Sequence, residues 1–140
     1  MQTVLTVDEI EAFLRDVFPQ IEGEASIERV APMAARMRLH VADRHLRPGG
    51  TVSGPAMFML ADVTFYVAVL AMIGREPLTV TTTLTINFLR KPPLADLIGE
   101  ARILKLGRTL ATGDVLLFGE GDGDRPVAHA TCSYAIPQRG

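Results

Sequence analysis

One acidic side chain, Asp62, lies in the middle of a long apolar stretch of the sequence, residues 54–73. A carboxylate is seldom buried without a partner or a purpose, because removing its charge from water costs several kcal/mol or more. A carboxylate in such a place can act as a general base or as a nucleophile. A structural role, with its oxygens bonded to threonine hydroxyls or to the backbone, is the alternative.

The start of the same stretch has the residues of a helix N-terminus. Ser53 can cap a helix, Gly54 lets another group approach the backbone, and Pro55 suits a first turn. We therefore predict a central helix over residues 53–74, with Asp62 roughly 12 Å along the axis from Gly54 at ~1.5 Å per residue. One straight helix does not bring the two together, whereas the same helix of a partner chain could.

The predicted helix is apolar on every side, so it must be buried on every side. Its length also fits a membrane span. The central Asp62, the lack of a basic flank after Arg47 and the strand-like segments that follow favour a core helix instead. We expect no membrane association.

Composition limits the other possibilities. The chain has 140 residues, 48% hydrophobic and 21% charged, which fits a single domain over residues 1–140 with a real core. A net charge of -2 gives no electrostatic footprint for nucleic acid. The single cysteine, Cys132, excludes an intrachain disulfide and a cysteine-based zinc site, and no metal is expected. Acidic residues near the N-terminus, where a secretory signal would be basic, favour the cytoplasm.

The remaining elements are read from capping and periodicity. Thr6 and Glu9 form a capping-box pattern for a short N-terminal helix within residues 1–20, ended by Pro19. Strands are predicted at residues 25–30, 34–41, 78–88, 98–106, 110–118 and 128–136. A curved antiparallel sheet around the central helix would bury most of it, and the N-terminal helix or a partner chain would cover the rest.

Alternation assigns faces to two of these strands. In residues 78–88 one face carries Leu78, Val80, Leu84, Ile86 and Phe88, and the other carries Thr79, Thr81, Thr83, Thr85 and Asn87. In the last strand, Cys132 and Tyr134 share the apolar face, so Cys132 is expected in the core rather than as a nucleophile.

Three segments, in this order, resemble the hotdog fold and more narrowly the PaaI-like acyl-CoA thioesterases, over about residues 20–137. They are Gly50-Thr-Val-Ser-Gly-Pro-Ala-Met-Phe-Met-Leu-Ala-Asp62, Thr85-Ile-Asn-Phe-Leu-Arg-Lys-Pro92, and Gly107-Arg108 followed by Val-Ala-His-Ala-Thr-Cys-Ser-Tyr134. The resemblance implies an α+β hotdog fold, a coenzyme A thioester as substrate, no further cofactor, and a homodimer or a dimer of dimers.

The resemblance also implies roles for individual residues. Asp62 would attack the thioester or deprotonate water, and the N–H of Gly54 from the opposite protomer would bind the thioester oxygen. Ser53 and Thr81 would assist. The family's histidine is Ser53 here, its second glycine is Pro55, and an asparagine of the preceding loop corresponds to Arg47. These changes remove groups that help to place the thioester or water.

Substrate contacts are expected at both ends of the thioester. Candidates for the phosphates of coenzyme A are Arg90, Lys91, Lys105 and Arg108, and further contacts are expected from His45, Arg47, Pro55, Phe58 and Thr83. An acyl or aryl pocket lined by Met57, Phe58, Phe65 and Tyr66 is also predicted, although core packing would explain the same residues.

Three functions follow from this reading. The first is an acyl-CoA thioesterase. The second is an acyl-CoA-binding protein that has lost turnover through the changes at Ser53 and Arg47. The third, a hotdog dehydratase or hydratase, usually employs a histidine with an acid, and the spacing here offers no suitable pair.

Overall fold

The computed structural model describes residues 2–138 and contains two α-helices, two short 3-10 helices and six strands. The helices are α1 (Val7–Val17) and α2 (Gly54–Ile73), and the 3-10 helices are η1 (Pro19–Ile21) and η2 (Asp43–His45). The strands are β1 (Ala25–Ala31), β2 (Ala34–Leu39), β3 (Val80–Phe88), β4 (Leu97–Leu106), β5 (Leu110–Gly119) and β6 (Ala128–Ala135). Every predicted element is present, with ends shifted by at most two residues.

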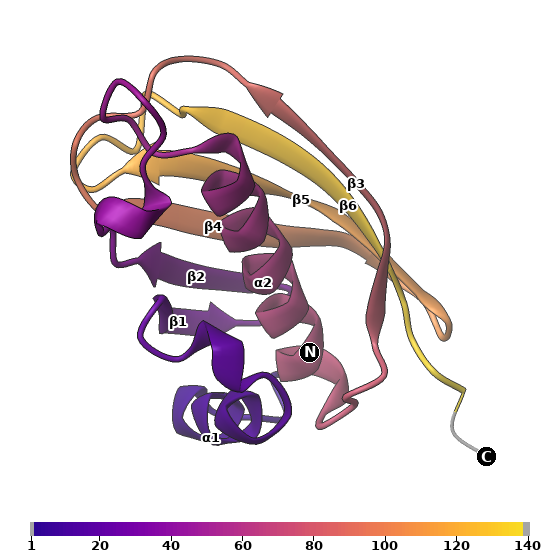
Figure 1. The fold of residues 1–140 in the computed structure, drawn as a ribbon. Helices are drawn as coiled ribbons and strands as arrows, with labels where there is room; N and C mark the ends of the chain where they lie inside the picture. Colours follow the sequence, from indigo (N-terminus) through magenta and orange to yellow (C-terminus); the bar gives the residue numbers. More distant parts are fainter. Residues whose placement is uncertain (1, 139–140) are drawn as a thin grey trace.

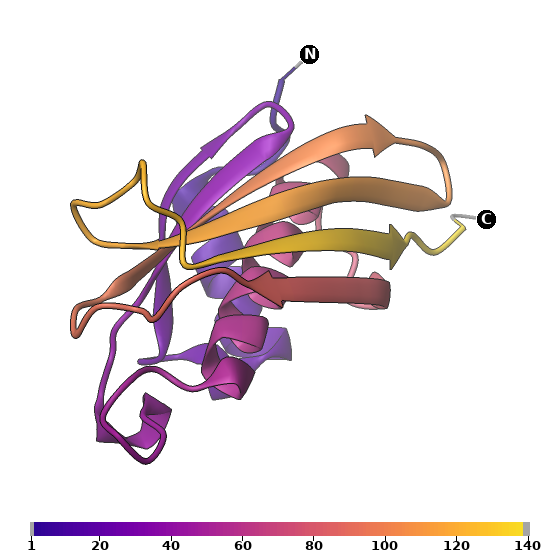
Figure 2. The same cartoon turned by 90° about the horizontal axis from the view of Figure 1, so that it is seen from above.

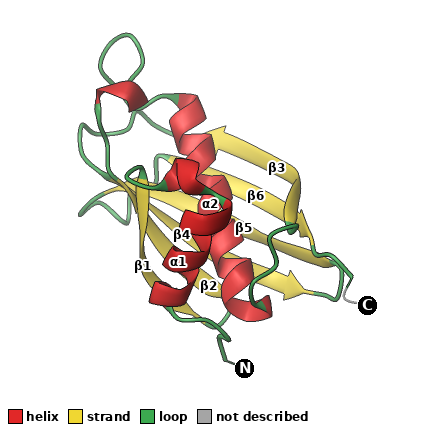
Figure 3. Cartoon of the chain, turned by 60° about the horizontal axis from the view of Figure 1, so that its bottom comes forward, coloured by secondary structure: helices red, strands yellow, loops and turns green. Residues whose placement is uncertain are grey.

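The six strands form one antiparallel sheet in the order β1-β2-β4-β5-β6-β3. Figures 1 and 2 show that the sheet is curved and that α2 lies along its concave side. Figure 3 shows α1 beside α2, over the β1 end of the sheet. The strand β3, which follows α2 in the chain, therefore forms the edge opposite to β1.

Local sequence explains where the two helices begin and end. The Thr6 hydroxyl accepts from the Glu9 N–H while the Glu9 carboxylate accepts from the Thr6 N–H, which is the predicted capping box. Ser53 caps α2 by accepting from the Ala56 N–H, as predicted. Gly74, at a φ of 99°, ends α2 in a conformation that side chains rarely adopt.

The helix α2 is long and apolar enough to cross a membrane, but most of it is buried within the fold. Burial on every side, as the sequence predicted, is not what this single chain shows. A stripe of partly or fully exposed residues at helical spacing follows the side of α2 next to β3, namely Pro55, Phe58, Met59, Asp62 and Tyr66. We call it the open stripe. The one carboxylate of α2 lies within it.

The alternation predicted for β3 is wrong at its first half. A β-bulge lies between Thr81 and Thr83, so Thr81 is opposite Tyr134 while Leu84 is opposite Cys132, and all four face α2. Before the bulge the threonines point inward: Thr79 is buried, whereas Leu78 and Val80 are exposed. Because an extra residue reverses the faces, periodicity alone assigned Thr81 to the wrong side.

A glycine on β5 sets how closely α2 approaches the sheet. A Cβ at Gly113 would lie 2.7 Å from a ring carbon of Phe65 and 2.9 Å from the Ile103 Cα, and closer still to the Arg102 carbonyl oxygen. Phe65 is fully buried on α2. Only a glycine therefore fits between this ring and the neighbouring strand.

We expect Gly113→Ala to lower the free energy of unfolding by about 2 to 3 kcal/mol, because the added methyl meets backbone that cannot move aside. Urea unfolding at neutral pH measures the change. Gly123→Ala is the matched control, since its Cβ would meet only Phe118 ring carbons at 3.6 Å or more. Equal stability of the two variants would contradict this account of the packing.

Candidate active site

The Asp62 carboxylate is held by two hydroxyl groups. The Thr81 hydroxyl donates to Asp62 Oδ1 at 2.6 Å, and the Tyr134 hydroxyl lies 2.5 Å from the same oxygen. The Tyr134 hydroxyl is also 2.8 Å from the Asp62 carbonyl oxygen. Among residues 2–138 no hydrogen bond to Oδ2 and no ion pair to this carboxylate is found. The acid therefore depends on neutral donors alone.

Sequence reasoning missed the part that Tyr134 plays in this site. Alternation placed it in the core, and its ring is indeed packed between those of Phe65 and Tyr66, with centroids at 5.4 and 6.1 Å. A buried tyrosine hydroxyl usually needs a partner, which is the signal that could have pointed to Asp62. Burial, together with the nearby carboxylate, raises the pKa of Tyr134 far above its usual value, so the phenol remains a donor.

Asp62 lines a cavity of about 320 Å³ between α2, the C-terminal end of α1 and the start of β3. We call it the carboxylate cavity. Its other walls are mostly apolar and include Phe18, Met59, Tyr66 and Pro77. The hydroxyl of Thr79, another lining residue, is buried without a hydrogen-bond partner in the described part of the chain. A charged oxygen beside an apolar wall can act on a substrate whose reacting end is polar and whose tail is not.

The N-terminus of α2 offers one free backbone donor. The Ala56 N–H donates to the Ser53 hydroxyl and the Met57 N–H to the Ser53 carbonyl, while Pro55 has no N–H. The N–H of Gly54 has no acceptor among residues 2–138. Such a donor at the positive end of a helix is suited to a developing oxyanion. The Ser53 hydroxyl accepts in the cap and still has its own hydrogen to donate.

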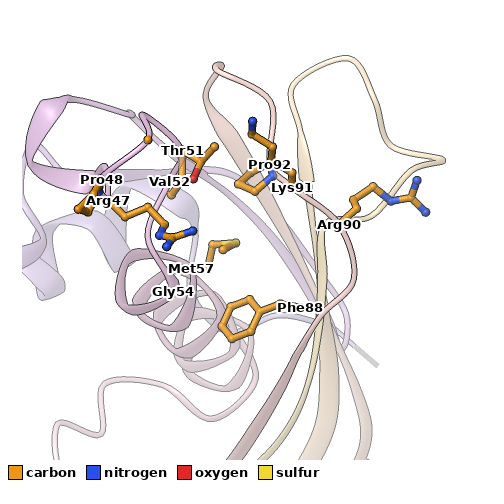
Figure 4. Close-up of a pocket in the computed structure, with 11 residues that line it drawn as sticks. Arg47, Pro48, Thr51, Val52, Gly54, Met57, Phe88, Arg90, Lys91 and Pro92 are labelled. Atoms are coloured by element: carbon orange, nitrogen blue, oxygen red, sulfur yellow. The ribbon is translucent and has the colours of Figure 1, made fainter.

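Gly54 lines a second cavity, of about 580 Å³, which we call the basic cavity. It lies between the loop before α2 and the segment after β3, and it includes Arg47, Met57, Arg90 and Lys91. Figure 4 shows the Arg47 side chain extending toward the centre, whereas Arg90 turns away. Arg90 Nε donates to the Pro126 carbonyl oxygen at 3.0 Å. The cation that faces this cavity most directly is thus Arg47.

Two predicted substrate contacts border a shallow apolar groove on the outer side of the same helix end. Pro55 and Phe58 line it together with Gly54, Ile86 and Phe88. Both Phe58 and Phe88 are exposed large apolar side chains, at 40% and 53% of their full area. The groove belongs to the open stripe and to the β3 edge.

His45 does not line either cavity. Its ring is buried, its Nδ1 accepts from the Ala42 N–H at 2.9 Å, and its Nε2 lies 2.6 Å from a Glu24 oxygen. Its carbonyl accepts from the Ser53 N–H at 2.7 Å. In this structure His45 therefore anchors the loop that leads to Ser53, and its contact with a substrate stays a prediction.

Several other candidates lie away from Asp62 and Gly54. Thr83 is exposed on the face turned from α2, opposite Ser133, because of the bulge. Lys105 is exposed on β4, and Arg108 borders a separate cavity of about 550 Å³ at the far end of α2, with Ile73. Phe65 is core, whereas Met57 and Tyr66 each line a cavity.

Cys132 is buried on β6, as predicted, and burial raises the pKa of its thiol to about 12. A thiol so rarely ionised is a poor nucleophile. Within residues 2–138 no group of three or more histidine, cysteine or acidic side chains is arranged to hold a metal ion.

Together, the curved antiparallel sheet, the long helix on its concave side and the acid on that helix define a protein of the hotdog thioesterase class. The chain belongs to the thioesterase superfamily: the family model of that description matches residues 49–126. The match includes Gly54 and Asp62 and ends before Tyr134.

Solved structures agree with this assignment. A protein from Silicibacter sp. TM1040, provisionally assigned as a thioesterase, is 57% identical over 98% of this chain and 95% of its own, with a TM-score of 0.90. A mutant of the phenylacetic acid degradation protein PaaI from Thermus thermophilus is 26% identical over 85% of this chain and 99% of its own, with a TM-score of 0.74. Zebra fish thioesterase superfamily member 2 shares the fold, at 22% identity over 95% and 99% of the two chains and a TM-score of 0.82. A search of curated proteins gave no match. These relatives support thioester hydrolysis as the general activity.

The contacts of Arg44 and His45 with Glu24, which anchor the loop before α2, give a testable prediction. Bonds from Arg44 above all, and also from His45, lower the pKa of Glu24 to about 2, against an ordinary value of about 4.5. The stabilisation by this carboxylate is therefore complete above about pH 4.5 and is lost as the pH falls through about 2. We expect Glu24→Gln to lower the free energy of unfolding at pH 7 by about 1 to 2 kcal/mol.

Urea unfolding at several pH values measures this effect. The difference between Glu24→Gln and the wild type should shrink below about pH 4.5 and approach zero near pH 2. The exposed Glu22→Gln is the control and should follow the wild type. A difference that is constant with pH would contradict the role of the Glu24 charge.

Proposed function

We propose that this protein hydrolyses an acyl-CoA thioester to the free acid and coenzyme A. One observation carries the proposal. Within residues 2–138, a carboxylate without a cationic partner lines a mostly apolar cavity, while a helix N-terminus on the same open side of the molecule has an N–H, that of Gly54, without an acceptor. An acid that can activate water and a donor for an oxyanion are the two groups that thioester hydrolysis requires.

The reaction proceeds by addition and elimination at the thioester carbonyl. As general base, Asp62 takes a proton from water while the water oxygen bonds to the carbonyl carbon, and the carbonyl oxygen becomes an oxyanion that accepts from a Gly54 N–H. The C–S bond then breaks, and the departing sulfur takes the proton back from Asp62. As nucleophile, Asp62 would instead attack the carbonyl carbon and break the C–S bond, so that the coenzyme A thiolate leaves and takes a proton from solvent. Water would then hydrolyse the resulting mixed anhydride to the free acid and the Asp62 carboxylate. Thr81 orients the carboxylate in either case.

The acyl and coenzyme A parts of the substrate fit different surroundings. The carboxylate cavity is mostly apolar, with about 320 Å³ of space, and suits an acyl or aryl group of modest size. The basic cavity is lined by Arg47 and Lys91 and suits the anionic phosphates of coenzyme A. Arg108, at the far end of α2, lies too far along the helix to join the same cluster within one chain.

We further propose that two copies of the chain form the complete site. In one chain, Asp62 and Gly54 lie two turns apart on α2 and line different cavities. The open stripe and the groove of Phe58, Ile86 and Phe88 leave an apolar surface beside the β3 edge. Exposed apolar surface and an unpaired strand edge favour association. A second copy, turned about a two-fold axis, would bring its Gly54 toward the first copy's Asp62.

A second candidate function is binding of an acyl-CoA without turnover. It is favoured by Arg47 and Ser53, which occupy the positions where the resembling thioesterases have an asparagine and a histidine. The basic cavity would then hold coenzyme A, but no thiol would be released.

We expect Asp62→Asn to reduce thiol release from acyl-CoA substrates by about 100-fold or more, because the amide cannot take a proton from water. A thiol reagent follows turnover across short, medium and aryl acyl-CoAs, and calorimetry follows binding. Asp114→Asn is the matched control. That carboxylate pairs with Arg102 and His129 on the sheet face turned from α2, and its loss should leave turnover nearly unchanged.

The outcomes separate the two candidates. Turnover by the wild type that persists in Asp62→Asn would contradict the proposed mechanism. Binding of acyl-CoA by the wild type with no thiol released would favour the second candidate. Neither binding nor turnover with any acyl-CoA would contradict both.

A further inference from the structure

The contacts of Asp62 carry an inference about a residue outside the matched part of the family, Tyr134. Two hydroxyls converge on one oxygen of the carboxylate. Thr81 donates to Oδ1 at 2.6 Å and Tyr134 lies 2.5 Å from it. Two donors on one oxygen fix the plane of the carboxylate and leave the other oxygen, Oδ2, without a bond in the described part of the chain.

We propose that Tyr134 is a positioning residue, which together with Thr81 holds Oδ1 of Asp62 and leaves Oδ2 as the oxygen that meets water or the thioester. The inference rests on the proposed function and adds a residue to it. Tyr134 does not touch the reacting atoms in this scheme. It acts through the carboxylate.

The ring of Tyr134 is placed for this task. It is packed between Phe65 and Tyr66, and its backbone lies in β6 opposite Thr81. The hydroxyl also reaches the Asp62 carbonyl oxygen at 2.8 Å, which ties β6 to that turn of α2. A rigid aromatic ring and a sheet register thus determine where Oδ1 lies. Because of the bulge after Thr81, the second donor, Thr81 itself, lies on the same face of the sheet as Tyr134.

The titratable groups around Asp62 are neutral, which leaves the two hydroxyls as its hydrogen-bond donors. The titratable groups that face it are Tyr134 and Cys132 on β6 and Tyr66 on its own helix, and burial raises the pKa of all three. All three are neutral at pH 7. Val17 and Phe18, which border the cavity from α1 and its end, carry no charge. Among residues 2–138 no cation contacts Asp62, so the two hydroxyls are the groups that hold its side chain.

A matched pair of variants tests the proposal. Tyr134→Phe removes the hydroxyl and keeps the ring, while Tyr66→Phe removes a hydroxyl from the same cavity that makes no bond to Asp62. Loss of a hydrogen bond from a hydroxyl to a carboxylate should move the titration of that carboxylate upward by about one pH unit or more. The acid limb of kcat against pH should move up by that amount in Tyr134→Phe and stay in place in Tyr66→Phe.

The same shift can be read without turnover. In protein labelled with ¹³C at the aspartate carboxyl carbon, the signal that Asp62→Asn removes belongs to Asp62, and its titration midpoint is compared among wild type, Tyr134→Phe and Tyr66→Phe. Thr81→Val, which removes the other donor, should shift it in the same direction. The double variant should shift it further.

The outcomes are distinct from those of the proposed function. Equal midpoints in wild type and Tyr134→Phe, or equal shifts in Tyr134→Phe and Tyr66→Phe, would overturn the positioning role. A wild type that releases no thiol, with the midpoint shifted in Tyr134→Phe and not in Tyr66→Phe, would overturn the hydrolase and keep the role of Tyr134 in holding the carboxylate. A shift in both the midpoint and the acid limb supports both.

Discussion

The structure depends on one carboxylate, Asp62, placed in an apolar helix with no cation in contact with it among residues 2–138. The Asp62 carboxylate is held by hydroxyls of β3 and β6, so the helix and the two strands must keep one register for both hydrogen bonds to form. A cation would have quenched the charge more strongly and would also have made the carboxylate a weaker base. Neutral donors satisfy one oxygen, and the other has no hydrogen bond within residues 2–138. This compromise explains why the site is built across α2 rather than on a loop.

The candidate acid, Asp62, and the candidate oxyanion donor, Gly54, lie on one helix for a physical reason. A helix N-terminus is the simplest place to find an unpaired backbone N–H, and Ser53 and Pro55 leave Gly54 as that donor. The acid needs an apolar wall, and the interior turns of α2 provide it together with the end of α1 and the start of β3. A single straight helix cannot satisfy both demands at one point in space. The open stripe, which joins both ends, is therefore the surface on which a second copy would complete the site.

Much of the fold could be predicted because the signals were local. Capping at Thr6 and Ser53 and the apolar run of α2 are properties of neighbouring residues, and they fixed the helices closely. The faces of β3 could not be predicted, since one extra residue at the bulge reverses every side chain beyond it. The structural contact of His45 could not be predicted for a related reason. Its partner Glu24 lies 21 residues earlier, and such a pairing has no periodic signal.

The same limit explains why Tyr134 was assigned only to the core. Its position in an alternating strand is explained fully by packing, and nothing in the last strand indicates that its hydroxyl ends at a carboxylate 72 residues earlier. Family resemblance pointed to Asp62 and Gly54, which lie within the matched residues, whereas the matched region ends before Tyr134. A buried hydroxyl that must find an acceptor, and a buried acid that must find a donor, are complementary demands. Among the described residues no cation contacts Asp62, so its partners had to be neutral donors. Matching buried hydroxyls to a buried acid across the predicted sheet is therefore a way to find, from sequence, the residues that support a site.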